Sequence, residues 1–335
     1  MKYTPLDQIK TEQLDNVTHI VYGVPRLKFN NTHYMGSQLE VSAITGIPKP
    51  NNYTYDAICI SISPGCFNTP GCLYCATGEL SYQLRITQNK VLTTEDILAQ
   101  IILTKEYMQK NNLEFGKELS IAFMGKGEPG LYPELIMNSL NIGYDAKLFS
   151  KSSISTTGNP VWIKKLTKAY DSLEKLTNFE LPALQISIQS PLDSQRYGLV
   201  SNKNALAPID DVLKTAVENY ALHERGSKKV SLRYTLMDNN GEKNFSEVII
   251  NKFGNKIIKL NKQYEQQGFE GYMIIVANLN ETTYSQARNI KTATDEDVDN
   301  AIEQLKKMGL NANHFSQKKG SVSTCGTFAE NEIEN

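Results

Sequence analysis

The chain has 335 residues, 40 % of them hydrophobic, and its 35 basic and 36 acidic side chains leave a formal net charge of −1. This length suffices for one large α/β domain or two small ones, each with an ample core. The near-zero charge counts mildly against a strongly basic nucleic-acid-binding domain. No apolar run approaches membrane-spanning length and the polar N-terminus lacks a signal-peptide core, so we expect a cytoplasmic protein with no membrane partner.

The first 55 residues differ in pattern from the rest of the chain. Residues 18–29 and 33–45 alternate in places between apolar and polar side chains, and Asn30 and Asn31 separate the two stretches. Such alternation on either side of a turn predicts a β-hairpin or a small meander. We therefore expect a short N-terminal β-rich extension over residues 1–55.

Residues 56–328 alternate between short apolar strands and amphipathic helices, and an acidic stretch over 329–335 is expected to be a mobile tail. Strands are predicted to begin near Ile58, Leu119, Ser153, Ala183, Val230 and Tyr272. Helices are predicted over about 93–110, 132–143, 160–173, 208–224, 245–266 and 294–308. Six β–α units imply an α/β fold with a parallel sheet, either open and twisted or closed into a (βα)6 partial barrel. In both cases ligands bind at the carboxyl ends of the strands.

Three of the five cysteines, Cys66, Cys72 and Cys75, lie within ten residues directly after the first of these strands. Such crowding in a chain without a secretory signal favours ligation of a soft metal over a disulfide framework. Three thiolates on a four-iron cluster leave one iron open for a substrate or cofactor. A structural zinc site that also uses Cys59, seven residues before Cys66, and thiols without any metal remain alternatives.

The loop after the second strand, Gly125–Gly130, matches the pattern G-x-G-x-x-G that is typical of dinucleotide-binding folds. That fingerprint also expects an acidic residue at the end of the next strand, where this chain has Ser155, Thr156 and Thr157. The glycines therefore either let the backbone approach an amino-acid-like ligand closely or form an ordinary tight turn. Both interpretations stay open.

The fifth cysteine, Cys325, lies among small residues near the C-terminus, in the segment 320–326. It is either an unremarkable buried thiol or part of a flexible loop that brings a thiol to the mouth of a barrel. The histidines show no spacing typical of metal ligands. We interpret His19, His33, His223 and His314 as structural or surface residues.

Together these motifs resemble the RlmN/Cfr-type radical-SAM RNA methyltransferases, from about Ser37 to Ala329. The similar segments are Cys59–Cys66, Leu73–Gly78, Phe123–Pro129, Ser155–Gly158, Ile186–Gln189, Asn278 and Thr324–Phe328. The resemblance implies a radical-SAM (βα)6 partial barrel with a 4Fe–4S cluster held by Cys66, Cys72 and Cys75. It also implies that S-adenosyl-L-methionine (SAM) is bound by Gly127, Glu128, Ser155, Ser187, Ile188, Gln189 and Asn278.

The same resemblance implies a two-cysteine mechanism that methylates an sp2 carbon of adenine in ribosomal or transfer RNA. Cys325 would carry the methyl group, and Cys59 would release the methylated base by forming a disulfide with it. Glu40 matches the general base of the family, or else is a charged residue of the N-terminal hairpin. The reaction needs an electron donor such as a flavodoxin or a ferredoxin.

The chain departs from the family pattern in three places. Five residues separate Cys66 from Cys72, where the family has three, and Gln189 stands where the family usually has histidine. The N-terminal extension is also too short for the helical RNA-binding accessory domain of the family. The same chemistry on a nucleotide, a small molecule or another RNA is therefore one alternative. A non-catalytic zinc or iron–sulfur module is a second.

Overall fold

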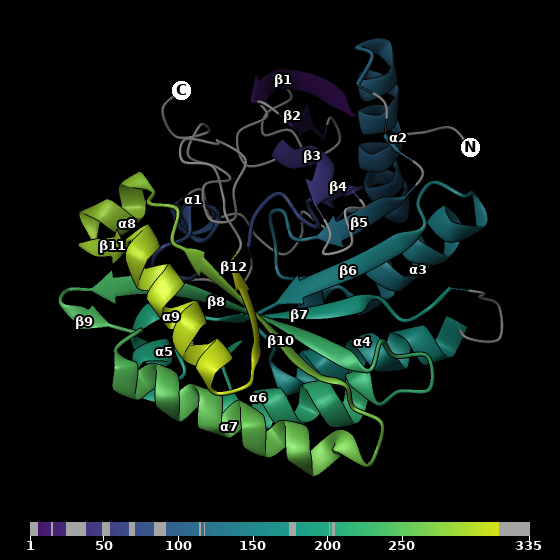
Figure 1. Ribbon diagram of the computed structural model, residues 1–335. Coiled ribbons are helices and arrows are strands. Elements are labelled where there is room, and N and C mark those ends of the chain that lie inside the picture. The colour runs from purple at the N-terminus through teal and green to yellow at the C-terminus, as the bar shows by residue number, and fades with distance from the viewer. Residues whose placement is uncertain are drawn as a thin grey trace.

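A computed structural model describes residues 6–14, 16–24, 38–48, 54–66, 71–83, 92–113, 115–116, 118–173, 179–200, 202 and 205–314. The described residues form one mixed sheet with helices packed along it (Figure 1). The strands are Asp7–Leu14 (β1), Val17–Gly23 (β2), Gln38–Pro48 (β3), Thr54–Ile60 (β4), Leu119–Phe123 (β5), Lys151–Thr156 (β6), Ala183–Ile188 (β7), Lys229–Asn239 (β8), Glu242–Lys243 (β9), Gly271–Asn278 (β10), Ile290–Thr292 (β11) and Asn311–His314 (β12).

The sheet follows the order β1-β2-β3-β4-β5-β6-β7-β8-β10-β12, with β9 and β11 paired to β8 beside this path. From β4 to β12 the neighbouring strands are parallel. All six predicted strands occur at the predicted places, as β4 to β8 and β10. Among the described strands the path does not close on itself, so the fold is an α/β fold with an open, mostly parallel sheet.

The described helices are Ala76–Gln83 (α1), Thr94–Lys110 (α2), Pro133–Asp145 (α3), Pro160–Leu173 (α4), Asp193–Leu199 (α5), Ile209–Ala216 (α6), Glu247–Glu265 (α7), Thr283–Ala287 (α8) and Asp295–Lys307 (α9), with a π-helical turn at Val217–Ala221 after α6. The six predicted helices are present as α2, α3, α4, α6, α7 and α9, and the short helices α1, α5 and α8 were not predicted. Thr93 and Asp96 form a reciprocal capping box at the start of α2, which satisfies two backbone amides. None of the described helices is both long enough and apolar enough to cross a membrane.

The alternation of side chains along each parallel strand decides which face is covered by helices. Ile154, Ile186 and Leu232 belong to the main apolar core, where they meet helix residues such as Leu166 and Val212. Successive residues of a strand point to opposite faces, so the intervening serines and other polar residues of β6, β7 and β8 lie on the opposite side. Figure 1 shows α3, α4, α6 and α7 along the outer side of the sheet.

The N-terminal extension continues the same sheet. The predicted hairpin is present as the antiparallel pair of β2 and β3, although its turn lies outside the described residues. β1 pairs with β2 and was not predicted, and β3 pairs with β4 in antiparallel fashion. Strand β12, at the far edge, was also missed because Asn311–His314 is short and polar. The division into segments 1–55, 56–328 and 329–335 stays a prediction.

Candidate active site

A cavity of about 130 Å³ lies at the carboxyl ends of the parallel strands. Its lining comes from the segments that follow β4 and β5, from the last residues of β6, β7 and β10 with the residues directly after them, and from β8. The lining residues are Cys66, Cys72, Tyr74, Cys75, Thr77, Met124, Gly125, Gly127, Glu128, Ser155, Thr156, Thr157, Ser187, Ile188, Gln189, Arg233, Thr235, Asn278, Leu279 and Asn280. Every residue that was predicted to bind the metal or the cofactor belongs to this lining.

Backbone contacts fix the two ends of the cysteine loop. The amide of Cys66 donates to Ser81 Oγ at 2.7 Å, and Ser81 donates in turn to the carbonyl of Thr77 in α1. Cys75 N donates to the carbonyl of Cys72 at 3.0 Å. The backbone of Cys72 also forms an isolated antiparallel β-bridge with that of Val200. The segment between the first two cysteines, residues 67–70, lies outside the described residues.

The described cysteines are thiols, and none of them forms a disulfide. Among the described histidines, cysteines and acidic residues, no group of three could hold a single metal ion. Cys66, Cys72 and Cys75 all line the cavity, so the thiols on both sides of residues 67–70 come to one place.

Glu128 joins the loop after β5 to the end of β6. Its Oε1 accepts from Gly130 N at 2.9 Å and from Thr156 Oγ1, and its Oε2 accepts from the amide and hydroxyl of Thr157, both at 3.0 Å. Burial raises the pKa of Glu128, and these hydrogen bonds act against the rise. Because both carboxylate oxygens accept hydrogen bonds, Glu128 holds the loop after β5 against the end of β6 and also lines the cavity.

The glycine-rich loop is held against the segment after β4. Gly127 adopts a positive φ of +104°, and a Cβ there would meet Ile62 Cγ2 and Ser63 Oγ at 2.5 Å. The carbonyl of Lys126 accepts from Ile62 N at 2.8 Å, and Ser61 Oγ accepts from Lys126 N at 3.2 Å. The loop needs glycine at residue 127 because a side chain has no space there.

Two amide side chains in the lining carry buried atoms without a hydrogen-bond partner among the described residues. They are Nε2 and Oε1 of Gln189 and Oδ1 of Asn278. Asn278 Nδ2 donates to Asp295 Oδ1 at 2.6 Å, so one end of that amide is fixed. Buried amide groups nearly always find a partner, and these atoms therefore fit a polar ligand in the cavity.

Arg233 brings a guanidinium into the lining from β8. Its Nη1 donates to Met124 Sδ at 3.7 Å, and Gln185 Nε2 donates to the same sulfur at 3.6 Å and to Ser155 Oγ at 3.1 Å. Sequence reasoning missed Arg233 because it lies inside a strand and not in a motif. Its position between Leu232 and Tyr234, both fully buried in the core, could have placed it on the cavity face.

Cys59 does not line the cavity but lies on the same face of the sheet. It pairs with Ala122 of β5, which pairs with Ser153 of β6. Met124 and Ser155 follow these partners by two residues and line the cavity. Since side chains two residues apart share a face, Cys59 lies one step back from the cavity, with 5 % of its surface exposed.

Glu40 shares this face, since Ser42, two residues on, pairs directly with Cys59. Glu40 is buried and does not line the cavity. Its Oε1 lies 2.9 Å from Lys126 Nζ, and its Oε2 lies 3.8 Å from His19 Nε2. Burial, followed by the charge of Lys126, lowers the pKa of His19 to about 4. Glu40 is thus part of a buried ion cluster, made of Glu40, Lys126 and His19, behind the glycine-rich loop.

No sequence pattern pointed to this cluster, beyond the position of Lys126 between two glycines. His19, which was interpreted as a structural or surface residue, is buried, and its contact with Glu40 was not foreseen. Cys325 lies outside the described residues, so its predicted role as methyl carrier stays a prediction.

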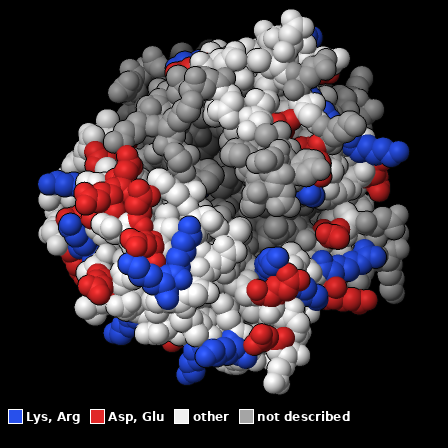
Figure 2. Space-filling model, viewed as in Figure 1, with Lys and Arg blue, Asp and Glu red and all other residues white. Residues whose placement is uncertain are grey.

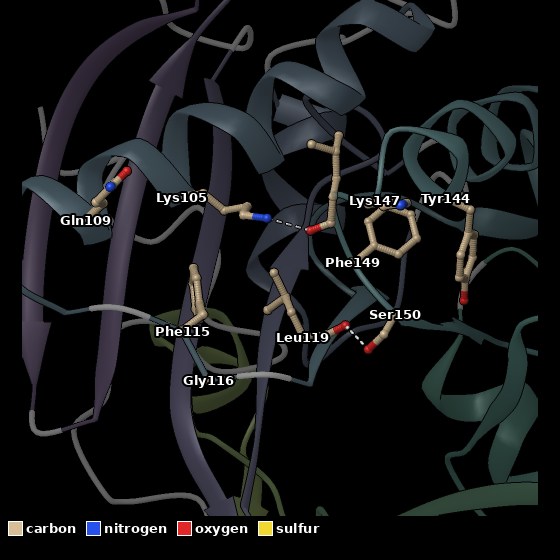
Figure 3. Close-up of a pocket in the computed structure, with 10 residues that line it drawn as sticks. Lys105, Gln109, Phe115, Gly116, Leu119, Tyr144, Lys147, Phe149 and Ser150 are labelled. Carbon is tan, nitrogen blue, oxygen red and sulfur yellow. Dashed lines mark hydrogen bonds between the residues drawn. The ribbon is translucent and has the colours of Figure 1, made fainter.

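A larger hollow of about 560 Å³ lies at the amino ends of β5 and β6 (Figure 3). Lys105, Phe115, Tyr144, Lys147 and Phe149 line it, together with Gln109, Gly116, Leu119, Leu148 and Ser150. Lys105 Nζ donates to the carbonyl of Leu148 at 2.8 Å, and Ser150 Oγ donates to that of Leu119 at 3.2 Å. None of the residues predicted to have a functional role lies in this hollow.

A solved structure with a similar fold identifies the fold of this chain. A radical SAM methyltransferase from Sphaerobacter thermophilus superposes with a TM-score of 0.72 over 97 % of this chain and 81 % of that one, at 20 % identity. No family model matches the chain. The fold is that of a radical-SAM methyltransferase.

Proteins with similar sequences bear the names of RNA methyltransferases. The chain is 29 % identical over 290 residues to a protein of Clostridium botulinum (strain Loch Maree) named ribosomal RNA large subunit methyltransferase Cfr, covering 83 % of this chain and 71 % of that protein. It is 30 % identical over 183 residues to a probable dual-specificity RNA methyltransferase RlmN of Chloroflexus aurantiacus, covering 54 % and 44 %. The chain is thus similar over most of its length to proteins named Cfr and, over about half, to one named RlmN, and the resemblance predicted from its motifs is confirmed.

Proposed function

We propose that this protein methylates an sp2 carbon of adenine in ribosomal or transfer RNA, using a 4Fe–4S cluster and SAM. The observation that carries the proposal is the single cavity at the carboxyl ends of the strands. It gathers Cys66, Cys72 and Cys75 with the amide and hydroxyl groups that family motifs assign to SAM. The two relatives named above are RNA methyltransferases, which supports the same substrate class here.

In this proposal the three cysteines hold the cluster, and the residues that follow β5, β6, β7 and β10 hold SAM. When bound, the cluster would relay an electron from a flavodoxin- or ferredoxin-type donor, and SAM would supply the carbon radical that methylation of an adenine carbon requires. The donor set suits both groups, because thiolates prefer iron–sulfur centres. The amide of Gln189 and the oxygen of Asn278, which have no hydrogen-bond partner among the described residues, suit a ligand rich in polar atoms.

The thiol of Cys59 would act after methyl transfer. Its position on the cavity face, one step behind Met124 and Ser155, supports the role of a resolving thiol that attacks the sulfur of Cys325. Thiol exchange of this kind releases the product and leaves a disulfide, which an external reductant reopens. Glu40 remains the proposed base, in ionic contact with Lys126.

The test is anaerobic reconstitution with iron and sulfide, followed by mass spectrometry of the Cys325 peptide and assay of 5′-deoxyadenosine. We expect S-methylation of Cys325 and reductive cleavage of SAM. Methyl transfer is then assayed with ribosomal RNA, transfer RNA and free adenosine nucleotides. An iron-loaded protein that neither methylates Cys325 nor cleaves SAM contradicts the proposal.

A second substrate class, a free nucleotide or small molecule, is favoured by surface charge. Figure 2 shows acidic side chains gathered over α8 and the start of α9, where Asp295, Glu296 and Asp297 form the first turn. A phosphate backbone avoids such a surface. Greater methyl transfer to free nucleotides than to either RNA would select this alternative.

A further inference from the structure

The side chain of Gln189 is the most unusual polar group in the cavity lining. Gln189 is 1 % exposed, and neither its Nε2 nor its Oε1 has a hydrogen-bond partner among the described residues. Its backbone is nevertheless fixed, because its carbonyl accepts from Asn244 Nδ2 at 2.6 Å. A primary amide that is buried with both ends unused is destabilising in a folded protein. A ligand in the cavity would remove this penalty.

Other polar groups of the lining are already used by the fold. The carboxylate of Glu128 accepts four hydrogen bonds, and Ser155 Oγ accepts from Gln185. Asn278 uses its nitrogen on Asp295 and keeps an unpartnered oxygen. Gln189 alone among these residues offers a donor and an acceptor side by side at one point of the wall.

A ligand that satisfies both ends must present an acceptor next to a donor in one plane. Adenine does so at its N6/N7 edge, where the amino group stands beside ring nitrogen N7, and a glutamine amide pairs with that edge through two hydrogen bonds. At the same edge guanine and hypoxanthine present two acceptors, O6 and N7, and can form only one of the two bonds. Tyr74, Ile188 and Leu279 line the same cavity and provide apolar surface for the face of a ring.

We propose that the side-chain amide of Gln189 is an adenine-reading group, with Nε2 donating to ring nitrogen N7 and Oε1 accepting from the amino group. The inference rests on the proposed function, which brings adenine to the site both in SAM and in the substrate. The two sources share one chemistry, and experiment separates them.

The test compares wild-type protein with Gln189→Met, which keeps the length of the side chain but loses both hydrogen-bonding ends. Gln304→Met, in α9 and away from the cavity lining, is the matched control. Binding of S-adenosylhomocysteine is measured by calorimetry without RNA. SAM cleavage and kcat/KM for methyl transfer are then measured with the reconstituted enzyme.

If Gln189 reads the cofactor adenine, Gln189→Met weakens S-adenosylhomocysteine binding about 10- to 100-fold, the range typical of one bidentate amide–adenine contact. If it reads the substrate adenine, that binding and SAM cleavage stay unchanged while kcat/KM for the nucleic acid falls by a similar factor. In both cases Gln304→Met behaves as wild type. Wild-type values within twofold in every assay of Gln189→Met overturn the inference.

A measurement on wild-type protein covers the case in which Gln189→Met does not fold. S-inosylhomocysteine, which has an oxygen in place of the amino group, is compared with S-adenosylhomocysteine, and inosine is compared with adenosine as an inhibitor of methyl transfer. We expect at least a tenfold preference for adenine in one of the two pairs. A preference below twofold in both pairs contradicts the inference. A wild-type preparation that cleaves no SAM and methylates nothing contradicts the proposed function instead.

Discussion

The carboxyl-end cavity lined by the cysteines and the amino-end hollow beside Lys105 lie at opposite ends of the same strands. They differ in volume and in how far their polar side chains are engaged by the protein. The amino-end hollow is the larger, at about 560 Å³ against about 130 Å³. Its polar groups are engaged by the protein, as Lys105 and Ser150 show by donating to backbone carbonyls. The carboxyl-end cavity is lined by three thiols and by the buried amide of Gln189, which has no hydrogen-bond partner among the described residues. The candidate active site is therefore distinguished by its thiols and by the unused hydrogen-bonding atoms of Gln189, and not by its volume.

The thiols provide the largest expected effect. Cys72→Ala removes one of three proposed cluster ligands, so we expect the reconstituted protein to lose its iron and to form no 5′-deoxyadenosine. Iron content and 5′-deoxyadenosine are measured by colorimetry and chromatography. Cys59→Ala is the matched control, because it should keep the iron and SAM cleavage but release no methylated product. Full iron content in Cys72→Ala would show that the carboxyl-end cavity is not a cluster site.

The second prediction concerns the buried ion cluster of Glu40, Lys126 and His19, which lies behind the glycine-rich loop of the carboxyl-end cavity. Lys126→Met removes the cation that lies 2.9 Å from the buried carboxylate of Glu40, and the free energy of unfolding should fall by about 3–5 kcal/mol. Urea denaturation measures this change. Glu40→Leu combined with Lys126→Met should be more stable than Lys126→Met alone, since both charges of the pair are then absent. Equal stability of the single and double variants would contradict the pairing.

The same cluster predicts a dependence of stability on pH. His19 has its pKa lowered from 6.5 to about 4 by burial and by Lys126, with a smaller lowering from Lys10, while Glu12 acts in the opposite direction. Between these values the unfolded chain binds a proton at His19 and the folded protein does not, so stability is present above pH 6.5 and is lost as the pH falls. Over that interval the free energy of unfolding from this residue falls by about 3 kcal/mol.

Urea titrations at pH 7, 6 and 5 measure this dependence. His19→Gln should show a flatter pH profile than wild type, whereas His223→Gln removes an imidazole from another part of the chain as a control. An unchanged slope in His19→Gln would exclude His19 as the source.

The smallest effect is expected at the amino-end hollow. Lys105→Met keeps the aliphatic stem and loses the hydrogen bond to the carbonyl of Leu148. We expect the free energy of unfolding to fall by about 1 kcal/mol, the usual net value of one hydrogen bond, with SAM cleavage unchanged. Thermal denaturation and 5′-deoxyadenosine assays measure the two quantities. A large loss of activity would show that the amino-end hollow takes part in function.

Much of the site was predictable because it follows a rule of topology. Each motif of the parallel strands comes directly after its strand, and parallel strands bring their carboxyl ends to one edge. The cysteine loop, the glycine-rich loop, Ser155 and Gln189 therefore lie around one cavity although they are far apart in the chain. Arg233 was missed because it lies within β8, where only the face of the strand decides what its side chain meets.

The amino-acid sequence by itself determined the six β–α units, the capping box of α2 and the resemblance to proteins named Cfr and RlmN. These depend on local pattern and short motifs, which each segment carries whether or not its neighbours are known. Only the tertiary structure decided that β3 lies antiparallel beside β4, which brings Glu40 within 2.9 Å of Lys126. It also decided that Gln189 is left with an unused amide. Both features depend on which distant side chains become neighbours, and no local pattern encodes that.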